Sequence, residues 1–242
     1  MENYEKETIA AIATALSDSG IGIVRISGEN AIYIVDSIFR SASGKKILTK
    51  VQSHMIHYGY IVDKDENIID EVMTSVMKAP KSYTMEDTVE INCHGGVLVM
   101  QKVLETVLQA GARLAEPGEF TKRAFLNGRI DLSRAEAVID VIHSQNEYAL
   151  SSSVSQLKGR LSDKIRSLRE DILYQIAFIE SALDDPEHIS LEGYPEQLAE
   201  KVTGFEKEIQ KLLATADNGR LMKDGISTVI VGKPNAGKSS LL

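Results

Sequence analysis

Hydrophobic and polar residues in the first half of the chain follow patterns that predict strands and helices together. The apolar run at 21–26 ends at Ser27 and Gly28 and predicts a buried strand. Residues 29–40 carry apolar side chains at helical spacing and predict a helix. Two β-rich runs, 53–62 and 68–77, flank the polar segment DKDEN and predict a hairpin. Such a mixture is typical of an α+β domain.

This segment closes with a further strand and helix. Residues 88–92 (TVEIN) predict a strand, which Gly95 and Gly96 break. Residues 97–110 then predict a helix that ends at Gly111. The sequence Glu-Pro-Gly at 116–118 indicates a boundary. We therefore place the α+β domain at residues 1–118.

Beyond residue 118 the pattern predicts helices only. Residues 119–144 predict two short helices that separate at Asn127 and Gly128. Asp131 or Ser133 is expected to cap the second helix, because either side chain can accept a hydrogen bond from a helix N-terminus. These helices begin an all-α domain, which we place at residues 119–219.

Two long amphipathic helices are predicted next. From 150 to 183 apolar residues recur every three or four positions, an eleven-residue repeat that keeps a stripe on one helix face. A second helix is predicted from Pro195 to the pair 218–219. We expect both stripes to pack in a core. Because two long helices make an incomplete bundle, we expect further helices from chain outside these residues.

The last segment carries a phosphate-binding motif. Residues 226–231 predict a strand, and 232–239 (GKPNAGKS) match the P-loop pattern G-x-x-x-x-G-K-[ST]. In such a loop backbone N–H groups surround the phosphates, Lys238 reaches the β- and γ-phosphates, and the Ser239 hydroxyl binds Mg²⁺. Residues 226–242 therefore predict the first strand and P-loop of an α/β nucleotide-binding domain, and the version GKPNAGKSSLL resembles the GTPases of the translation-factor-related class, which implies a GTPase domain. The expected GTP contacts are Asn235, Ala236, Gly237, Lys238, Ser239 and Ser240.

The remaining motifs of a GTPase do not occur in these 242 residues. No Asp-x-x-Gly follows the loop, and the guanine motif Asn-Lys-x-Asp occurs nowhere. A P-loop domain requires on the order of 100–200 residues, so we expect the chain to be a truncated piece of a longer protein. We expect it to contain no catalytic residue and to hydrolyse no GTP.

Composition narrows the class of protein. Acidic residues outnumber basic ones by 35 to 27, which gives a net charge of −8 and disfavours a broad nucleic-acid-binding surface. No apolar run reaches roughly 18 residues and the N-terminus is polar, so we expect a cytoplasmic protein with no membrane span. The one cysteine, Cys93, precedes His94. It can be a nucleophile or metal ligand, although we favour a small residue at a strand end.

Four stretches of the chain resemble the N-terminal half of the MnmE (TrmE) family of tRNA-modifying GTPases. They are GIGIVRISG (20–28), SYTMEDTVEINCHGG (82–96), EPGEFTKRAFLNGRIDLSRAEAVIDVI (116–142) and VGKPNAGKSSLL (231–242), in the order of the family. The resemblance implies an N-terminal tetrahydrofolate-binding domain like that of aminomethyltransferases, which forms a homodimer. It also implies a helical domain into which the GTPase domain is inserted.

The same resemblance implies one-carbon chemistry on tRNA. Family members work with the FAD-dependent partner MnmG to install an aminomethyl or carboxymethylaminomethyl group at C5 of the wobble uridine. The carbon comes from 5-formyl- or 5,10-methylene-tetrahydrofolate, and K⁺-dependent GTP hydrolysis drives a conformational change. In this sequence the folate contacts fall on Arg25, Glu90 and Arg129. The Mg²⁺ ligand falls on Ser239 and the K⁺ ligand on Asn235.

Each of these residues has an alternative interpretation. Arg25 can be a member of an internal ion pair, Glu90 an exposed strand residue, and Arg129 a solvated turn residue. Asn235 can be a loop residue that tolerates a tight turn. The alternative functions are a stand-alone folate-dependent one-carbon enzyme, a ribosome-assembly GTPase and a structural dimerisation module.

Overall fold

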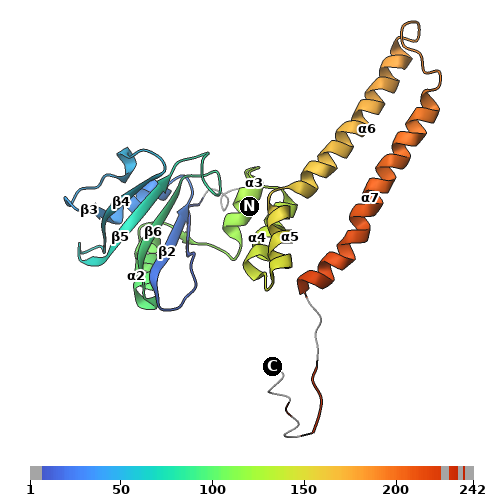
Figure 1. Cartoon of the computed structure of the whole chain (residues 1–242). Helices are drawn as coiled ribbons and strands as arrows, with labels where there is room; N and C mark the ends of the chain where they lie inside the picture. Colours follow the sequence, from blue (N-terminus) through green and yellow to red (C-terminus); the bar gives the residue numbers. More distant parts are fainter. Residues whose placement is uncertain (1–6, 225–228, 234–236, 238–242) are drawn as a thin grey trace. The chain divides into compact units, whose positions relative to one another are not determined.

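The computed structural model describes residues 7–224, 229–233 and 237 and divides the chain into two compact units (Figure 1). Unit 1 is Met1–Asp131 and unit 2 is Leu132–Leu242. The sequence places the first boundary after residue 118, whereas in the structure α3 (Glu119–Leu126) belongs to unit 1. Ion pairs through Arg123 fix this helix to the strand-bearing unit. No helix of the described residues is long and apolar enough to cross a membrane.

A seven-stranded mixed sheet forms the basis of unit 1. Its strands are β1 (Ile9–Ile12), β2 (Ser19–Ser27), β3 (Phe39–Ser41), β4 (Met55–Val62), β5 (Ile68–Met77), β6 (Thr88–Gly95) and β7 (Arg113–Leu114). They lie in the order β3-β4-β5-β6-β2-β1-β7, with β1 and β7 parallel and the other neighbours antiparallel. The predicted strands at 21–26 and 88–92 are confirmed in β2 and β6, and the predicted hairpin is confirmed in β4 and β5.

The other three strands are not predicted from the sequence. Strands β1, β3 and β7 are four, three and two residues long, too short for alternation to identify them. The predicted helix 29–40 is also wrong at its end, because α1 (Ala31–Ile38) stops before Phe39. Phe39 has an extended backbone and pairs with Ile61 of β4, so sheet pairing overrides the helical pattern there.

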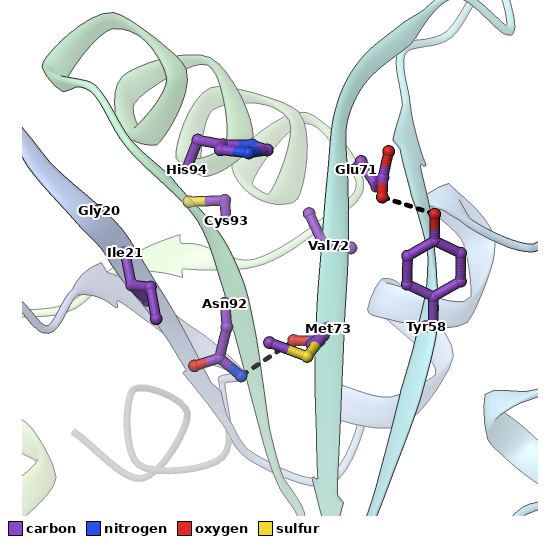
Figure 2. A pocket seen from close by; sticks show the side chains of 9 residues that line it. All are labelled: Gly20, Ile21, Tyr58, Glu71, Val72, Met73, Asn92, Cys93 and His94. Carbon is purple, nitrogen blue, oxygen red and sulfur yellow. Dashed lines mark hydrogen bonds between the residues drawn. The ribbon is translucent and has the colours of Figure 1, made fainter.

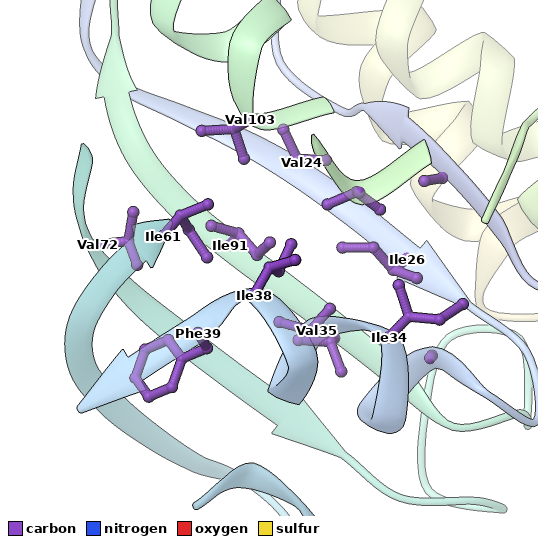
Figure 3. Close-up of a cluster of buried hydrophobic side chains, with 14 of the residues drawn as sticks. Val24, Ile26, Ile34, Val35, Ile38, Phe39, Ile61, Val72, Ile91 and Val103 are labelled. Atoms are coloured by element: carbon purple, nitrogen blue, oxygen red, sulfur yellow. The ribbon is translucent and has the colours of Figure 1, made fainter. Parts of the chain in front are cut away.

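The core of unit 1 lies between one face of the sheet and the helices α1 and α2 (Val97–Gln109) (Figure 3). Successive strand residues point to opposite faces. Val24 and Ile26 of β2 are therefore fully buried in this core, whereas Arg25 between them points to the opposite face. On β6, Val89 and Ile91 are buried in the same way on either side of Glu90. This alternation places charged side chains on the face that α1 and α2 leave open.

Unit 2 contains the helices α4 (Leu132–His143), α5 (Glu147–Leu157), α6 (Arg160–Asp184) and α7 (Tyr194–Asp224). The prediction of one helix over 150–183 is wrong, because the chain breaks at Gly159 between α5 and α6. Gly159 has a φ of 86°, a left-handed conformation that ends a helix and that glycine adopts readily. A Cβ atom at this position would lie 1.9 Å from Nη2 of Arg134 on α4.

Helices α6 and α7 lie side by side in antiparallel orientation (Figure 1). Lys164 pairs with Glu208 at 2.7 Å, and Lys201 donates a hydrogen bond to Gln175 at 2.9 Å. Helix α7 begins near Pro195 as predicted, but it continues past the pair 218–219 to Asp224. A glycine inside a helix costs about 1 kcal/mol, which a helix of 31 residues tolerates.

The apolar stripe of α6 is only partly buried. Leu168 is 6% exposed, but Ile165 is 51% and Leu183 is 69% exposed. The expectation that the whole stripe packs in a core is therefore wrong for this structure. The physical reason is that α7 is the only long helix beside α6 in the described part of the chain, and two long helices make an incomplete bundle that leaves part of the stripe uncovered.

The described part of the C-terminal segment has no strand. Residues 229–233 have no regular secondary structure, and Val229 and Val231 are 81% and 85% exposed, which contradicts the predicted strand for these residues. A strand is stable only when neighbouring strands accept its hydrogen bonds, and none of the described strands pairs with this segment. Gly237 has a φ of 76°. Residues 226–228 and the expected contacts Asn235, Ala236, Lys238, Ser239 and Ser240 lie outside the described residues.

Candidate functional site

Arg25 and Glu90 meet on the sheet face opposite the core. The register of β2 and β6 places them directly opposite each other, and Arg25 Nε donates a hydrogen bond to Glu90 Oε1 at 2.8 Å. The two side chains are 28% and 22% exposed, so a ligand can reach the pair. The interpretation of Arg25 as an ion-pair member is thus confirmed, and Glu90 is a half-buried residue rather than a freely exposed one. An ion pair of this kind can still bind a ligand through its unused atoms.

Tyr83 connects the third expected residue to this pair. The guanidinium carbon of Arg25 lies 5.4 Å from the centre of the Tyr83 ring and 5.7 Å from that of the Phe120 ring. The guanidinium carbon of Arg129 lies 4.8 Å from the same Tyr83 ring. Both arginines are within the range of cation–π attraction, about 6 Å. The structure therefore brings Arg25 and Arg129 to one aromatic ring, and Glu90 is joined to them through its ion pair with Arg25.

A buried ion-pair network fixes α3 to the sheet. Arg123 is 5% exposed and donates to both carboxylate oxygens of Glu86 at 3.2 Å. It also donates to Glu119 Oε1 at 3.1 Å and to the backbone carbonyl of Glu7 at 2.8 Å. Charge-assisted hydrogen bonds in a buried place are strong and directional. They therefore hold α3 in one position against the sheet.

The ends of α3 extend this attachment to the Tyr83 loop. Thr121 and Tyr83 share a hydrogen bond between their hydroxyl groups at 3.0 Å. Asn127, directly after the helix, donates to the backbone carbonyl of Thr84 at 2.6 Å. Arg129 follows in the same turn. Its place beside Tyr83 thus depends on α3 and on the network around Arg123.

Glu119 is the most perturbed carboxylate of this network. Burial alone would raise its pKa, but hydrogen bonds from Arg113, from the backbone N–H of Glu116 and from Arg123 lower the pKa to about 2. Arg113 donates to its two oxygens at 3.1 and 2.6 Å. Glu119 is therefore ionised at neutral pH and has no proton to donate. We conclude that the network positions α3 and does not act as a general acid.

A cleft of about 510 Å³ opens beside Tyr83 and Arg129. Neither Arg25 nor Glu90 lines it, so the cleft and the ion pair are neighbouring features that share Tyr83. No carboxylate is among its lining residues. The remaining lining residues are His54, Met77, Pro80, Lys81, Ser82 and Met85.

These features together determine which ligand can fit. Glu90 Oε2 accepts no hydrogen bond from the residues that the structure describes, so it is available to donors of a ligand. A carboxylate accepts such bonds readily from an amino-pyrimidine. Tyr83 presents an aromatic ring, and the guanidinium of Arg129 has no carboxylate partner in the described part of the chain. The site therefore fits a flat, donor-bearing ring with an anionic tail.

A second cleft, of about 250 Å³, lies on the strands β2, β4, β5 and β6 (Figure 2). Tyr58 donates to Glu71 at 2.5 Å, and Asn92 donates to the backbone carbonyl of Met73 at 2.9 Å. Tyr58, Glu71 and Asn92 thus have hydrogen-bond partners within the sheet, and none of the expected site residues lines this cleft.

Cys93 and His94 lie at this second cleft but do not form a catalytic or metal site. Cys93 lies inside β6 rather than at its end, is 3% exposed, and donates to the Gly22 carbonyl at 3.4 Å. Burial raises the pKa of its thiol to about 11, so the thiol is protonated at neutral pH. His94 bonds Asp70 at 2.7 Å, which raises the histidine pKa. The described residues contain no group of three side chains that could hold a metal ion.

Comparison with protein families identifies both units. The family model described as the N-terminus of the GTP-binding protein TrmE matches residues 8–129. The chain belongs to the MnmE (TrmE) family. A second model, described as the MnmE helical domain, matches residues 132–238. The two matches meet where the structure divides the chain, and they confirm an α+β domain followed by a helical domain.

Several curated relatives carry the name tRNA modification GTPase MnmE. The relative from Lachnoclostridium phytofermentans is 62% identical over 236 residues, which are 98% of this chain and 51% of the relative. Those from Bacillus subtilis and Geobacillus kaustophilus are 52% and 54% identical, over 98% of this chain and 52% of each relative. The chain therefore spans about half the length of these MnmE proteins.

Sequence reasoning missed Tyr83 and the residues that position it. Tyr83 lies in the stretch SYTMED, but no spacing rule distinguishes it from other tyrosines. Arg123 follows Glu119 by four residues, which is the spacing of an ion pair on a helix and was a usable signal. Lys81 and His54 belong to loops and carry no recognisable motif.

Proposed function

We propose that unit 1 binds a reduced folate at Arg25, Glu90 and Arg129, around the ring of Tyr83. One observation supports this most directly: Arg25 of β2 and Arg129 after α3 lie against a single aromatic ring, and Glu90 of β6 pairs with Arg25. Glu90 accepts hydrogen bonds from the amino-pyrimidine end of the pterin, held in place by Arg25. Arg129 attracts the acidic end of the molecule. When bound, 5-formyl- or 5,10-methylene-tetrahydrofolate supplies a one-carbon unit.

We further propose that this chain serves a tRNA-modifying GTPase of the cytoplasm. The printed names of its relatives and the P-loop pattern at 232–239 support this activity. Lys238 and neighbouring residues would hold GTP, Ser239 would hold Mg²⁺ and Asn235 would hold K⁺. Together with MnmG, the protein would place the folate-derived carbon on C5 of the wobble uridine.

Calorimetry with 5-formyltetrahydrofolate tests the folate site. Glu90→Gln removes the carboxylate charge at nearly constant shape, and a hydrogen bond to a charged group contributes about 1.5–3 kcal/mol. We expect wild type to bind and Glu90→Gln to bind at least about tenfold more weakly. Glu105→Gln, an exposed carboxylate on α2 that pairs with Lys102, is the matched control and should bind like wild type. Absence of binding to wild type, or equal binding by Glu90→Gln, would refute the assignment.

We propose in addition that the chain forms a homodimer through unit 1. Sedimentation equilibrium of the 242-residue chain tests this proposal, with two chains per particle as the expected result. A particle of one chain at all concentrations would contradict it. A dimer whose wild type binds no folate would favour a structural dimerisation module instead.

A further inference from the structure

The cleft beside Tyr83 contains basic side chains that lack acidic partners. Lys81 and Arg129 line it together with His54. Within the described part of the chain, neither the ammonium of Lys81 nor the guanidinium of Arg129 forms an ion pair with a carboxylate. The whole chain has a net charge of −8, so two unpaired cations in one cleft run against its overall charge. Their placement indicates that the cleft binds an anionic ligand.

The cleft is joined to the proposed pterin site through Tyr83. The Tyr83 ring lies near Arg25, which pairs with Glu90, and the same tyrosine lines the cleft. A folate carries its pterin at one end and its glutamate at the other. A molecule whose pterin contacts Glu90 can therefore extend past Tyr83, with its acidic end reaching Arg129 and Lys81.

The cleft is large enough to hold more of a ligand than a single terminal carboxylate. At about 510 Å³ it falls within the range of sites that bind whole small molecules, about 300–1,000 Å³. Met77, Met85 and Pro80 form apolar parts of its wall. Such a wall suits the methylene groups of a flexible acidic chain, while the cations bind its carboxylates.

We propose that this cleft binds the γ-linked polyglutamate tail of the folate, so that the protein selects polyglutamylated over monoglutamylated folates. Arg129 holds a carboxylate of the first glutamate, and Lys81 holds one added by the following glutamates. This inference rests on the proposed folate function. An RNA phosphate is the competing anion, but the net charge of −8 disfavours the broad basic surface that RNA binding requires.

The expected preference follows from the strength of exposed ion pairs. One such pair contributes about 0.2–1 kcal/mol, so the pair that the added glutamates form with Lys81 should improve affinity about 1.4-fold to fivefold. Salt screens exposed charges over about 8–10 Å at moderate ionic strength. The preference should therefore shrink in high salt, whereas contacts with the pterin should change less.

Calorimetry with 5-formyltetrahydrofolate carrying one or three glutamates tests the inference. In wild type we expect the triglutamate to bind about 1.4-fold to fivefold more tightly. Lys81→Gln should remove most of this preference and leave the monoglutamate affinity within about twofold. Lys102→Gln replaces a surface lysine of α2 and is the matched control, which should keep the full preference.

The outcomes separate this inference from the folate function itself. Equal affinity of wild type for both forms, with binding still weakened by Glu90→Gln, would overturn the inference and leave the folate site intact. No binding of either form would overturn both. A binding of tRNA that weakens in Lys81→Gln, while the triglutamate preference persists, would assign the cleft to phosphate and overturn the inference.

Discussion

Replacement of Arg123 by methionine tests the claim that a buried network positions α3 and Arg129. Methionine keeps much of the volume of the arginine side chain but removes every hydrogen-bond donor. In the structure the guanidinium serves two carboxylates, Glu86 and Glu119, at 3.1–3.2 Å. The variant leaves both carboxylates without this partner in a poorly solvated place.

The expected loss follows from the partners that remain. Removing one member of a buried ion pair costs about 3–5 kcal/mol. Glu119 keeps Arg113, and Glu86 is 21% exposed and keeps the hydroxyl of Ser27, so part of the compensation persists. We therefore expect the free energy of unfolding of unit 1 to fall by about 3 kcal/mol.

Hydrogen exchange measured by mass spectrometry distinguishes the two units. Amides of β2, β6 and α3 should exchange about a hundredfold faster in Arg123→Met, since 1.4 kcal/mol corresponds to a factor of ten. Amides of α6 should not change. The control Lys102→Met breaks the ion pair with Glu105, whose two side chains are 58% and 53% exposed, and should lower the free energy of unfolding by less than about 0.5 kcal/mol. If Arg123→Met were as mild as this control, the reasoning would be refuted.

Three further predictions concern other parts of the chain. The pKa of Glu119 is about 2 in the folded protein and 4.5 ordinarily, so its contribution to stability should be complete above pH 4.5 and lost as pH falls toward 2. In urea unfolding, the free energy of unfolding of Glu119→Gln should approach that of wild type only at the acid end of this range. Gly159→Ala should destabilise unit 2 by about 1–2 kcal/mol, because Gly159 has a left-handed backbone and little room for a Cβ atom. Gly204→Ala inside α7 should stabilise unit 2 by about 0.5–1 kcal/mol, because alanine favours a helix. Thermal melts in which both variants shift the melting temperature in the same direction would contradict this prediction. A thiol reagent at pH 8 should label Cys93 in urea but not in the native protein, and rapid native labelling would show that the thiol is not buried.

The strands of the sheet were predictable where apolar and polar residues alternate over enough positions to identify a strand. In β2 a charged residue, Arg25, separates the apolar residues Val24 and Ile26, and this pattern alone places the charge opposite the core. The pairing of Arg25 with Glu90 was not predictable from the pattern. It depends on β6 lying next to β2, and 65 residues separate the two side chains.

The helix break at Gly159 shows a limit of periodicity. Apolar residues continue in phase from α5 into α6, so the pattern does not reveal that the chain turns there. A glycine in a left-handed conformation ends the first helix, and its packing against Arg134 depends on tertiary structure. In the candidate site, Tyr83 is the corresponding case, because its role arises only when α3 and the loop meet.

The most direct test of the account is a crystal structure of this chain with 5-formyltetrahydrofolate. The pterin should lie within hydrogen-bond distance of Glu90 and beside the Tyr83 ring, with the acidic tail directed toward Arg129. A folate bound in the cleft beside Cys93 and His94, or one that contacts neither Glu90 nor Tyr83, would contradict the central claim that these residues form the folate site.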